Sequence, residues 1–232
     1  MSTVRGARER ARIEITAAIK DEAKKQLAAE GAAKLSLRAV ARELGMASSA
    51  LYRYFPSRDE LLTALIVDAY DAVGAAAEAA HRAARAEDAP HLARWLAVTR
   101  AVRGWALAHP HEYALIYGSP VPGYTAPRAT IGPAARVGLV LIAVVVDAHR
   151  ADALTLPPLA GDLRGEAERM VTDIAPDLPP EAATPLIAAW SQLFGLISFE
   201  VFGQFHRVVE NREVFFREAA TALARTVGLP GA

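Results

Sequence analysis

Residues 35–62 read LSLRAVARELGMASSALYRYFPSRDELL, and this stretch decides how the chain begins to fold. Ser36 can cap a helix, because its hydroxyl can accept a hydrogen bond from an unpaired backbone N–H of the first turn. The apolar residues that follow are spaced i, i+3, i+4 and i+7 and so share one helix face: Leu37, Val40, Ala41 and Leu44. Gly45 comes next and suits the left-handed conformation that ends many helices. The pattern predicts a short helix that stops at Gly45.

A second short helix is expected over about residues 47–54, with Phe55 buried after it. Pro56 ends this helix, because a proline disfavours helical backbone at the residue before it. Ser57 and Glu60 form an S-x-x-E capping box that starts another helix. Two short helices joined by a tight turn make a helix-turn-helix, which places its second helix in the major groove of DNA.

Helical periodicity continues through the rest of the chain. The expected helices cover residues 8–30, 57–85, 91–109, 111–117, 130–154, 166–174, 186–209 and 212–227. Residues 155–185 hold six of the 14 prolines and are expected to be irregular around one short helix. We predict an all-α fold: an N-terminal three-helix helix-turn-helix domain (1–56) and a C-terminal helical domain for ligand binding and dimerisation (57–232). The helix after Ser57 connects the two.

The net charge of the 232-residue chain is zero, which alone argues against a nucleic-acid-binding protein. The distribution of charge reverses that argument. Residues 1–60 hold 12 basic and 8 acidic side chains, and residues 61–232 hold 14 and 18. A basic end on an acidic body is expected when only one end meets phosphate. The offset is small and matters because the helix-turn-helix lies in the same segment.

The composition favours a soluble chain without disulfide bonds or thiolate metal sites. There is no cysteine, so neither a disulfide nor a thiolate metal site can form. The N-terminus lacks the apolar core of a signal peptide. The longest apolar run, residues 137–146, is about half of what a bilayer requires. We therefore expect a cytoplasmic protein with no membrane partner.

The stretch from Leu51 to Leu62 resembles the N-terminal domain of the tetracycline-repressor (TetR) family. In that pattern a short recognition helix ends in Leu-Tyr-x-Tyr/His-Phe and is followed by a Ser, a basic residue and an acidic-Leu-Leu start. The chain departs from it twice, with Ala47 in place of Ser or Thr and Arg58 in place of Lys. The first change removes an N-cap that Ser48 could replace, and the second changes the geometry of the charge.

The resemblance implies a regulator that binds double-stranded operator DNA, and the chemistry of the side chains suggests roles within it. Ser48 and Ser49 could contact base edges or phosphate, and Ala50 a thymine methyl. Arg53 is the only basic residue on the second helix, so any bidentate contact to guanine would be made by Arg53. The resemblance assigns the hydroxyls of Tyr52 and Tyr54 to phosphate. The remaining predicted contacts are also to phosphate: Ser36, Arg38 and Arg58 with the N-terminus of the following helix.

Two further segments, residues 109–118 and 190–195, resemble the subgroup of the family with a Trp-His-Gly type effector domain. Phe194 stands where that pattern has a histidine, so any role of the histidine is absent. The resemblance implies a small-molecule effector, and such pockets are mostly apolar with a few polar groups. The candidate effector-binding residues are Trp95, Trp105, Tyr113, Tyr117, His149, Trp190 and Phe194, and ordinary core packing is the competing explanation for each.

The helix expected over residues 186–209 is apolar nearly all round, and Glu200 is the only charge between Trp190 and Phe205. Such a helix cannot face water and must be buried on both sides. Gly195 and Gly203, eight residues apart, would allow another helix to approach closely. A homodimer formed by the last two helices satisfies this pattern. A central helix in a large monomeric domain is the alternative.

The sequence gives little support to catalysis. His109 and His111 are the only close pair of histidines, and Pro110 between them indicates a turn, so we predict no metal site. No nucleophile elbow, phosphate-binding glycine loop or H-E-x-x-H motif is present, and no cofactor is expected. The function predicted is a repressor that binds a palindromic operator as a dimer and is released by a small apolar effector. The alternative is an all-α dimeric carrier or enzyme that does not bind DNA.

Overall fold

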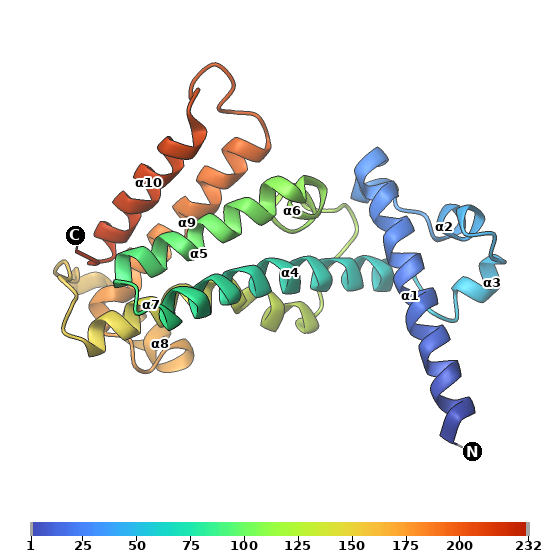
Figure 1. Cartoon of the computed structure of the whole chain (residues 1–232), viewed down its shortest axis with the longest axis horizontal. Coiled ribbons are helices and arrows are strands. Elements are labelled where there is room, and N and C mark those ends of the chain that lie inside the picture. The colour runs from blue at the N-terminus through green and yellow to red at the C-terminus, as the bar shows by residue number, and fades with distance from the viewer. Residues whose placement is uncertain (1, 231–232) are drawn as a thin grey trace. The chain divides into compact units, whose positions relative to one another are not determined.

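A computed structural model describes the backbone of residues 2–230 and the side chains from residue 6 onward. The fold is all-α, with no strand among these residues, as predicted (Figure 1). The α-helices are α1 (Ser2–Glu30), α2 (Leu37–Glu43), α3 (Ser48–Leu51), α4 (Arg58–Ala86), α5 (His91–Ala108), α6 (Pro110–Tyr117), α7 (Ile131–Arg150), α8 (Arg164–Ile174), α9 (Pro180–Val201) and α10 (Arg212–Thr226). Short 3-10 turns are η1 (Ala32–Lys34), η2 (Arg128–Thr130) and η3 (Gly161–Leu163).

The chain forms two compact units. The first, called the head here, contains Met1–Tyr70 and His109–Ile131. The second, called the body, contains Asp71–Ala108 and Gly132–Ala232. The helix α4 is continuous, so its first part belongs to the head and the rest to the body. The functional boundary at residues 56/57 stays a prediction.

Local signals build the head as the sequence predicts. The backbone N–H of Ala39 donates to Ser36 Oγ at 3.4 Å, so Ser36 caps α2. Gly45 has φ 63°, and the N–H of Met46 reaches back to the carbonyl of Ala41 at 2.8 Å, which closes the helix end. The N–H of Glu60 donates to Ser57 Oγ at 3.1 Å at the start of α4.

The core of the head is apolar and includes more of the chain than the N-terminal helices. Its buried centre is formed by Ile19, Ala23, Leu27, Leu35, Leu37, Val40, Ala41, Leu51, Phe55, Leu61, Leu62, Leu65 and Ile66. Leu115 and Ile116 of α6 pack against this centre. The hydroxyls of Thr63 and Tyr124 lie 2.9 Å apart, and Tyr70 Oη donates to the carbonyl of Ile116. The segment 109–131 therefore completes the head.

Figure 1 shows α5, α9 and α10 running beside one another in the body, where they pack together. Trp95 is fully buried, and its Nε1–H donates to the carbonyl of Ala220 at 3.1 Å. By length and composition alone, residues 128–150 and 180–201 could each cross a membrane. The core helix of a soluble protein passes the same test, and α7 and α9 both contribute buried side chains to the body.

Several predicted helix boundaries are wrong. The helix α1 begins at Ser2 and not at residue 8, and α3 ends at Leu51 and not at residue 54. The helix α9 begins at Pro180, because a proline is well accommodated in the first turn, where its missing N–H has no partner to lose. It ends at Val201 and not at residue 209, because Gly203 adopts φ 78°. Gly203 therefore closes the helix, and its predicted role with Gly195 in close helix packing stays a prediction. The helix α7 stops at Arg150, before Asp152 with its positive φ of 54°.

Candidate DNA-binding surface and effector pocket

The outer side of α3 and the turn after it present four of the predicted DNA-binding side chains to solvent: Ser48, Ser49, Tyr52 and Arg53. Leu51 is fully buried and anchors this segment to the head. Tyr52 is 40% exposed although it is aromatic. Because the core of the head holds the backbone of this segment in place, the four side chains point outward in the free protein.

The remaining predicted contacts differ in how freely they are presented. Arg38 is exposed at the start of α2, and Ser36 is half-buried because its hydroxyl caps that helix. Ala50 and Tyr54 are half-buried, and the guanidinium of Arg12 lies over the Tyr54 ring at 5.8 Å. All are in the head, as the resemblance implies.

Two details of the sequence interpretation change. Ala47 is the N-cap of α3 and no side chain caps this helix, so Ser48, which is the first helical residue, does not replace the missing cap. Arg58 donates to the carbonyls of Leu35, Ala32 and Ala33 at 2.9–3.2 Å. Its guanidinium therefore ties α4 to the segment before α2, and its predicted phosphate contact has to compete with those bonds.

The seven candidate effector residues do not form one cluster. Tyr113 and Tyr117 lie in the head, with ring centroids 5.1 Å apart. The other five are in the body: Trp95, Trp105, His149, Trp190 and Phe194. Trp95 and Trp105 are buried, and His149 is exposed in the last turn of α7. Their effector contacts stay predictions.

One cavity of the body is lined only by apolar residues and has a volume of about 320 Å³. Three helices and the residue after one of them form it: Ala135, Gly138, Leu139, Leu141 and Ile142 of α7, Met170 and Ile174 of α8 with Ala175, and Leu186, Ile187 and Trp190 of α9. Trp190 is the candidate residue that lines it, and Phe194 packs edge-on against Trp190 at 6.0 Å. The sequence did not indicate α7 and α8 as walls, because their apolar side chains look like ordinary core.

A second apolar surface, called the α9–α10 face here, is exposed in the single chain. Phe199, Phe202 and Phe215 are 54%, 43% and 39% exposed. Small residues, Gly195, Ala219 and Ala222, line a groove between the two helices. Exposed aromatic side chains of this size are uncommon on a monomer and mark an interaction surface.

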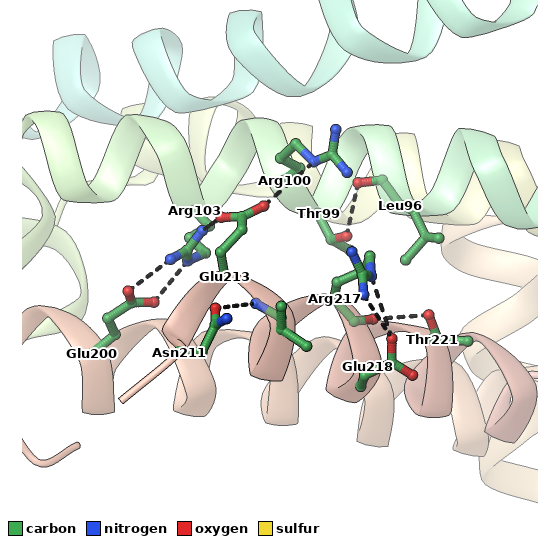
Figure 2. Close-up of polar contacts among 11 residues, drawn as sticks. Leu96, Thr99, Arg100, Arg103, Glu200, Asn211, Glu213, Arg217, Glu218 and Thr221 are labelled. Carbon is green, nitrogen blue, oxygen red and sulfur yellow. Dashed lines mark hydrogen bonds and ion pairs between the residues drawn. The ribbon is translucent and has the colours of Figure 1, made fainter. Parts of the chain in front are cut away.

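An ionic cluster fixes the two helices of this face to α5 (Figure 2). Arg103 is 8% exposed and donates to both carboxylate oxygens of Glu200, from Nε at 2.7 Å and from Nη2 at 2.8 Å. It also pairs with Glu213 of α10 and lies 5.1 Å from the ring of Phe216. The paired carboxylates raise the pKa of Arg103. The charge that seemed isolated in α9 is thus neutralised inside the body.

Comparison with known proteins agrees with this arrangement. The family described as "Bacterial regulatory proteins, tetR family" matches residues 19–65, and "Tetracyclin repressor-like, C-terminal domain" matches residues 95–223. The HTH-type transcriptional regulators Rv1816 of Mycobacterium tuberculosis and Mb1846 of Mycobacterium bovis are each 42% identical over 211 residues, 86% of either chain.

Solved structures give the same result. The structure of the regulatory protein SCO4313 is 37% identical, covers 93% of this chain and 97% of its own, and superposes with a TM-score of 0.75. The TetR-family regulator PfmR of Thermus thermophilus shares the fold at 20% identity, with a TM-score of 0.59 and coverage of 92% and 99%. The chain belongs to the TetR family. It is a DNA-binding transcriptional regulator and not an enzyme, which removes the alternative of a carrier or enzyme without DNA binding.

Proposed function

We propose that this regulator is a cytoplasmic repressor that binds a palindromic operator as a homodimer and is released by a small apolar molecule. The observation that carries the proposal is the exposed row on α3, held rigid by a buried core in a chain of a DNA-binding family. In this proposal residues 1–56 bind DNA, and residues 57–232 dimerise and bind the effector.

Within the head, Arg53 reads a base edge, because it is the exposed cation next to α3 and guanidinium groups bond guanine in a bidentate manner. Tyr52, Ser48 and Ser49 contact phosphate or base edges, and Ala50 contacts a thymine methyl. Phosphate contacts by Ser36, Arg38, Tyr54 and Arg58 fix the register. These contacts position the helix without reading sequence.

Dimerisation uses the α9–α10 face. Burying exposed phenylalanines supplies the driving force, at roughly 25 cal/mol for each Å² of apolar surface removed from water. The small residues of the groove allow the partner's helices to approach closely. A twofold dimer places two recognition segments on half-sites about one helical turn apart, which is why a palindromic site is expected.

The effector occupies the cavity between α7, α8 and α9. Its walls offer only apolar side chains, so the ligand is held by burial and shape. An apolar ligand therefore prefers this cavity to the exposed surface of the head, which offers hydroxyls and a guanidinium. Binding at one site changes affinity at the other by a common factor, because coupling is reciprocal.

Operator binding is tested by selecting sequences from random duplex DNA with the full-length protein and measuring affinity at two salt concentrations. We expect a palindrome and an affinity that falls steeply with salt. Arg53→Ala should weaken operator binding about 10- to 100-fold, the usual cost of one base contact. Arg169→Ala, an exposed arginine of α8, is the control and should leave binding unchanged. Failure to enrich any sequence would refute the proposal.

The cavity is tested with 1-aminoanthracene, an apolar fluorophore that brightens on leaving water. A side chain at Gly138 would meet open space, so Gly138→Leu should fill the cavity and abolish fluorophore binding. Gly104→Leu, at an α5 glycine that is equally unobstructed, is the matched control and should bind normally. Equal binding by both variants would place the ligand elsewhere.

A further inference from the structure

The side chain of Arg136, on α7, is clamped onto α4 by four hydrogen bonds. Its Nε and Nη2 donate to the two carboxylate oxygens of Glu78, each at 2.8 Å. Its Nη1 donates to the Oδ1 of Asp71 at 2.7 Å and to the carbonyl of Asp71 at 3.0 Å. A bidentate guanidinium–carboxylate pair fixes orientation as well as distance. Pairing with Arg136 also lowers the pKa of Glu78, so that carboxylate is charged at neutral pH.

Gly74 lies between Asp71 and Glu78 on α4 and leaves room for this clamp. A Cβ atom built on Gly74 would lie 2.7 Å from Cβ, 2.8 Å from Nε and 2.9 Å from Cδ of Arg136. Any side chain at position 74 therefore has to displace Arg136, and because the Cβ of Arg136 is fixed to the backbone, α7 has to shift away from α4 as well. Glycine disfavours a helix interior, and the close approach of Arg136 explains its presence here.

The same stretch of α7 forms a wall of the apolar cavity. Ala135, Gly138 and Leu139 line that cavity, and Arg136 lies among them in sequence but reaches to α4. At the far end of α7, Asp147 pairs with Arg85 of α4 at 3.4 Å. The helix α7 is thus fastened to α4 at two places, and α4 continues as one helix into the head.

We propose that the Arg136 clamp is the positioning contact that transmits occupation of the apolar cavity from α7 to α4, with Gly74 kept side-chain-free so that it can form. A ligand that moves α7 moves the guanidinium, and the bidentate pair makes α4 follow. Without the clamp, the ion pair of Asp147 with Arg85 remains, but the Arg85 side chain is 61% exposed and such a pair constrains little. The helix α7 can then adjust to a ligand while α4 stays where it is. This inference rests on the proposed function, because it requires an effector in the cavity and an operator-binding head.

The test measures three quantities on the full-length protein: the Kd for 1-aminoanthracene, the Kd for the selected operator, and the ratio of the fluorophore Kd with and without saturating operator. This ratio is the coupling factor. The variants are Gly74→Ala, which displaces Arg136, and Arg136→Met, which keeps most of the side-chain length and removes the charge. Thermal unfolding of each variant shows whether it is folded. If one of the two variants does not fold, Arg136→Lys replaces it, because this variant keeps the charge and removes the bidentate guanidinium.

Each variant has a matched control. Gly104→Ala makes the same change at a helical glycine where an added Cβ meets nothing within 4 Å. Arg82→Met removes a different arginine that pairs with Glu78. Arg82 lies on α4, its side chain is 71% exposed, and its Nη1 is 3.8 Å from the Glu78 carboxylate. Both controls should keep the wild-type coupling factor.

For the wild type we expect a coupling factor of about tenfold or more, within the usual range for allosteric pairs. In Gly74→Ala and Arg136→Met it should fall below about twofold, while each separate Kd changes by less than about threefold. A role in stability alone would lower the unfolding temperature and leave the coupling factor intact, and that result would overturn the inference. If the wild type itself shows no coupling, the proposed release by effector fails, and the inference fails with it for that separate reason.

Discussion

The contacts that stabilise the head and those that stabilise the body differ in how far apart their residues lie in the sequence. In the head, Ser36, Gly45 and Ser57 each act on backbone within a few residues of themselves. In the body, the bond from Trp95 to Ala220 spans 125 residues, and the pair Arg103–Glu200 spans 97. A short sequence motif can therefore identify the head. The contacts that stabilise the body join residues far apart in the sequence and are seen only in the structure.

The two units also offer partners opposite chemistry. The exposed side chains of α3 and the turn after it include hydroxyls and a guanidinium, which suit phosphate and base edges. The exposed side chains of the α9–α10 face are phenylalanines, which suit another apolar surface. The contrast is consistent with the proposed DNA partner of one unit and the proposed second copy of the chain at the other. The following predictions test the difference in the range of the stabilising contacts.

The largest effect is expected where the body depends on a distant pair. Arg103→Met should lower the free energy of unfolding by about 3 kcal/mol or more, because Glu200 would be left buried without a partner. The loss is measured by urea unfolding. The double variant Arg103→Met with Glu200→Leu should recover most of it, since both buried charges are then gone.

A body held by apolar packing alone would behave differently. The single and double variants would then unfold at the same urea concentration, and the ionic cluster would be an incidental contact. Arg100→Met offers a comparison on the same helix, because this arginine is 65% exposed and lies 4.0 Å from Glu213. An exposed ion pair of this kind contributes little, so stability should change by less than about 1 kcal/mol.

The sequence predicted the head well because its signals are local. The cap at Ser36, the turn at Gly45 and the start of α4 at Ser57 need no knowledge of the rest of the chain. The exposure of Ser48, Ser49, Tyr52 and Arg53 follows from the same helix geometry. The helix α6 itself was predicted over residues 111–117, but its packing against the N-terminal core was missed, because it depends on long-range contacts such as Tyr70 to Ile116.

The body was predicted only in outline. The apolar pattern of α9 indicated a buried helix, but its start at Pro180 was hidden in a proline-rich stretch expected to be irregular. The partner of Glu200 could not be chosen among many arginines, because no spacing rule links residues 97 positions apart. Gly74 lies inside a predicted helix, where glycine is unfavourable, and the reason for it became visible only in its close approach to Arg136 of another helix.

A medium effect is expected at Gly45, where a local signal can be changed without altering packing. Gly45→Ala should cost about 1 kcal/mol of unfolding free energy, because a left-handed backbone at φ 63° strains a residue that has a Cβ. An added Cβ would meet nothing within 4 Å, so strain is the only expected cost. Gly45→Asn should lose less, since asparagine tolerates this conformation. Equal stability of all three proteins in urea would show that the turn is not under conformational control.

The smallest effect is a pH dependence in the body, where His81 of α4 is 8% exposed and its Nε2 has no hydrogen-bond partner among the described residues. Burial lowers its pKa, and Asp147 opposes that shift while Arg85 and Arg94 add to it. Burial lowers the pKa of His91 in the same direction. The folded state therefore holds fewer protons than the unfolded state just below the ordinary histidine pKa of about 6.5.

Because the unfolded state binds protons first, the free energy of unfolding should be constant above about pH 7 and should fall as the pH drops from about 6.5 toward 5.5. The slope is a fraction of the roughly 1.4 kcal/mol per pH unit that one proton can contribute. Urea unfolding at several pH values measures it, and His81→Gln should flatten the curve while His206→Gln, at an exposed histidine, should not. If His81→Gln keeps the full slope, the acid sensitivity belongs to other groups, and the buried imidazole is protonated as readily in the folded body as in water.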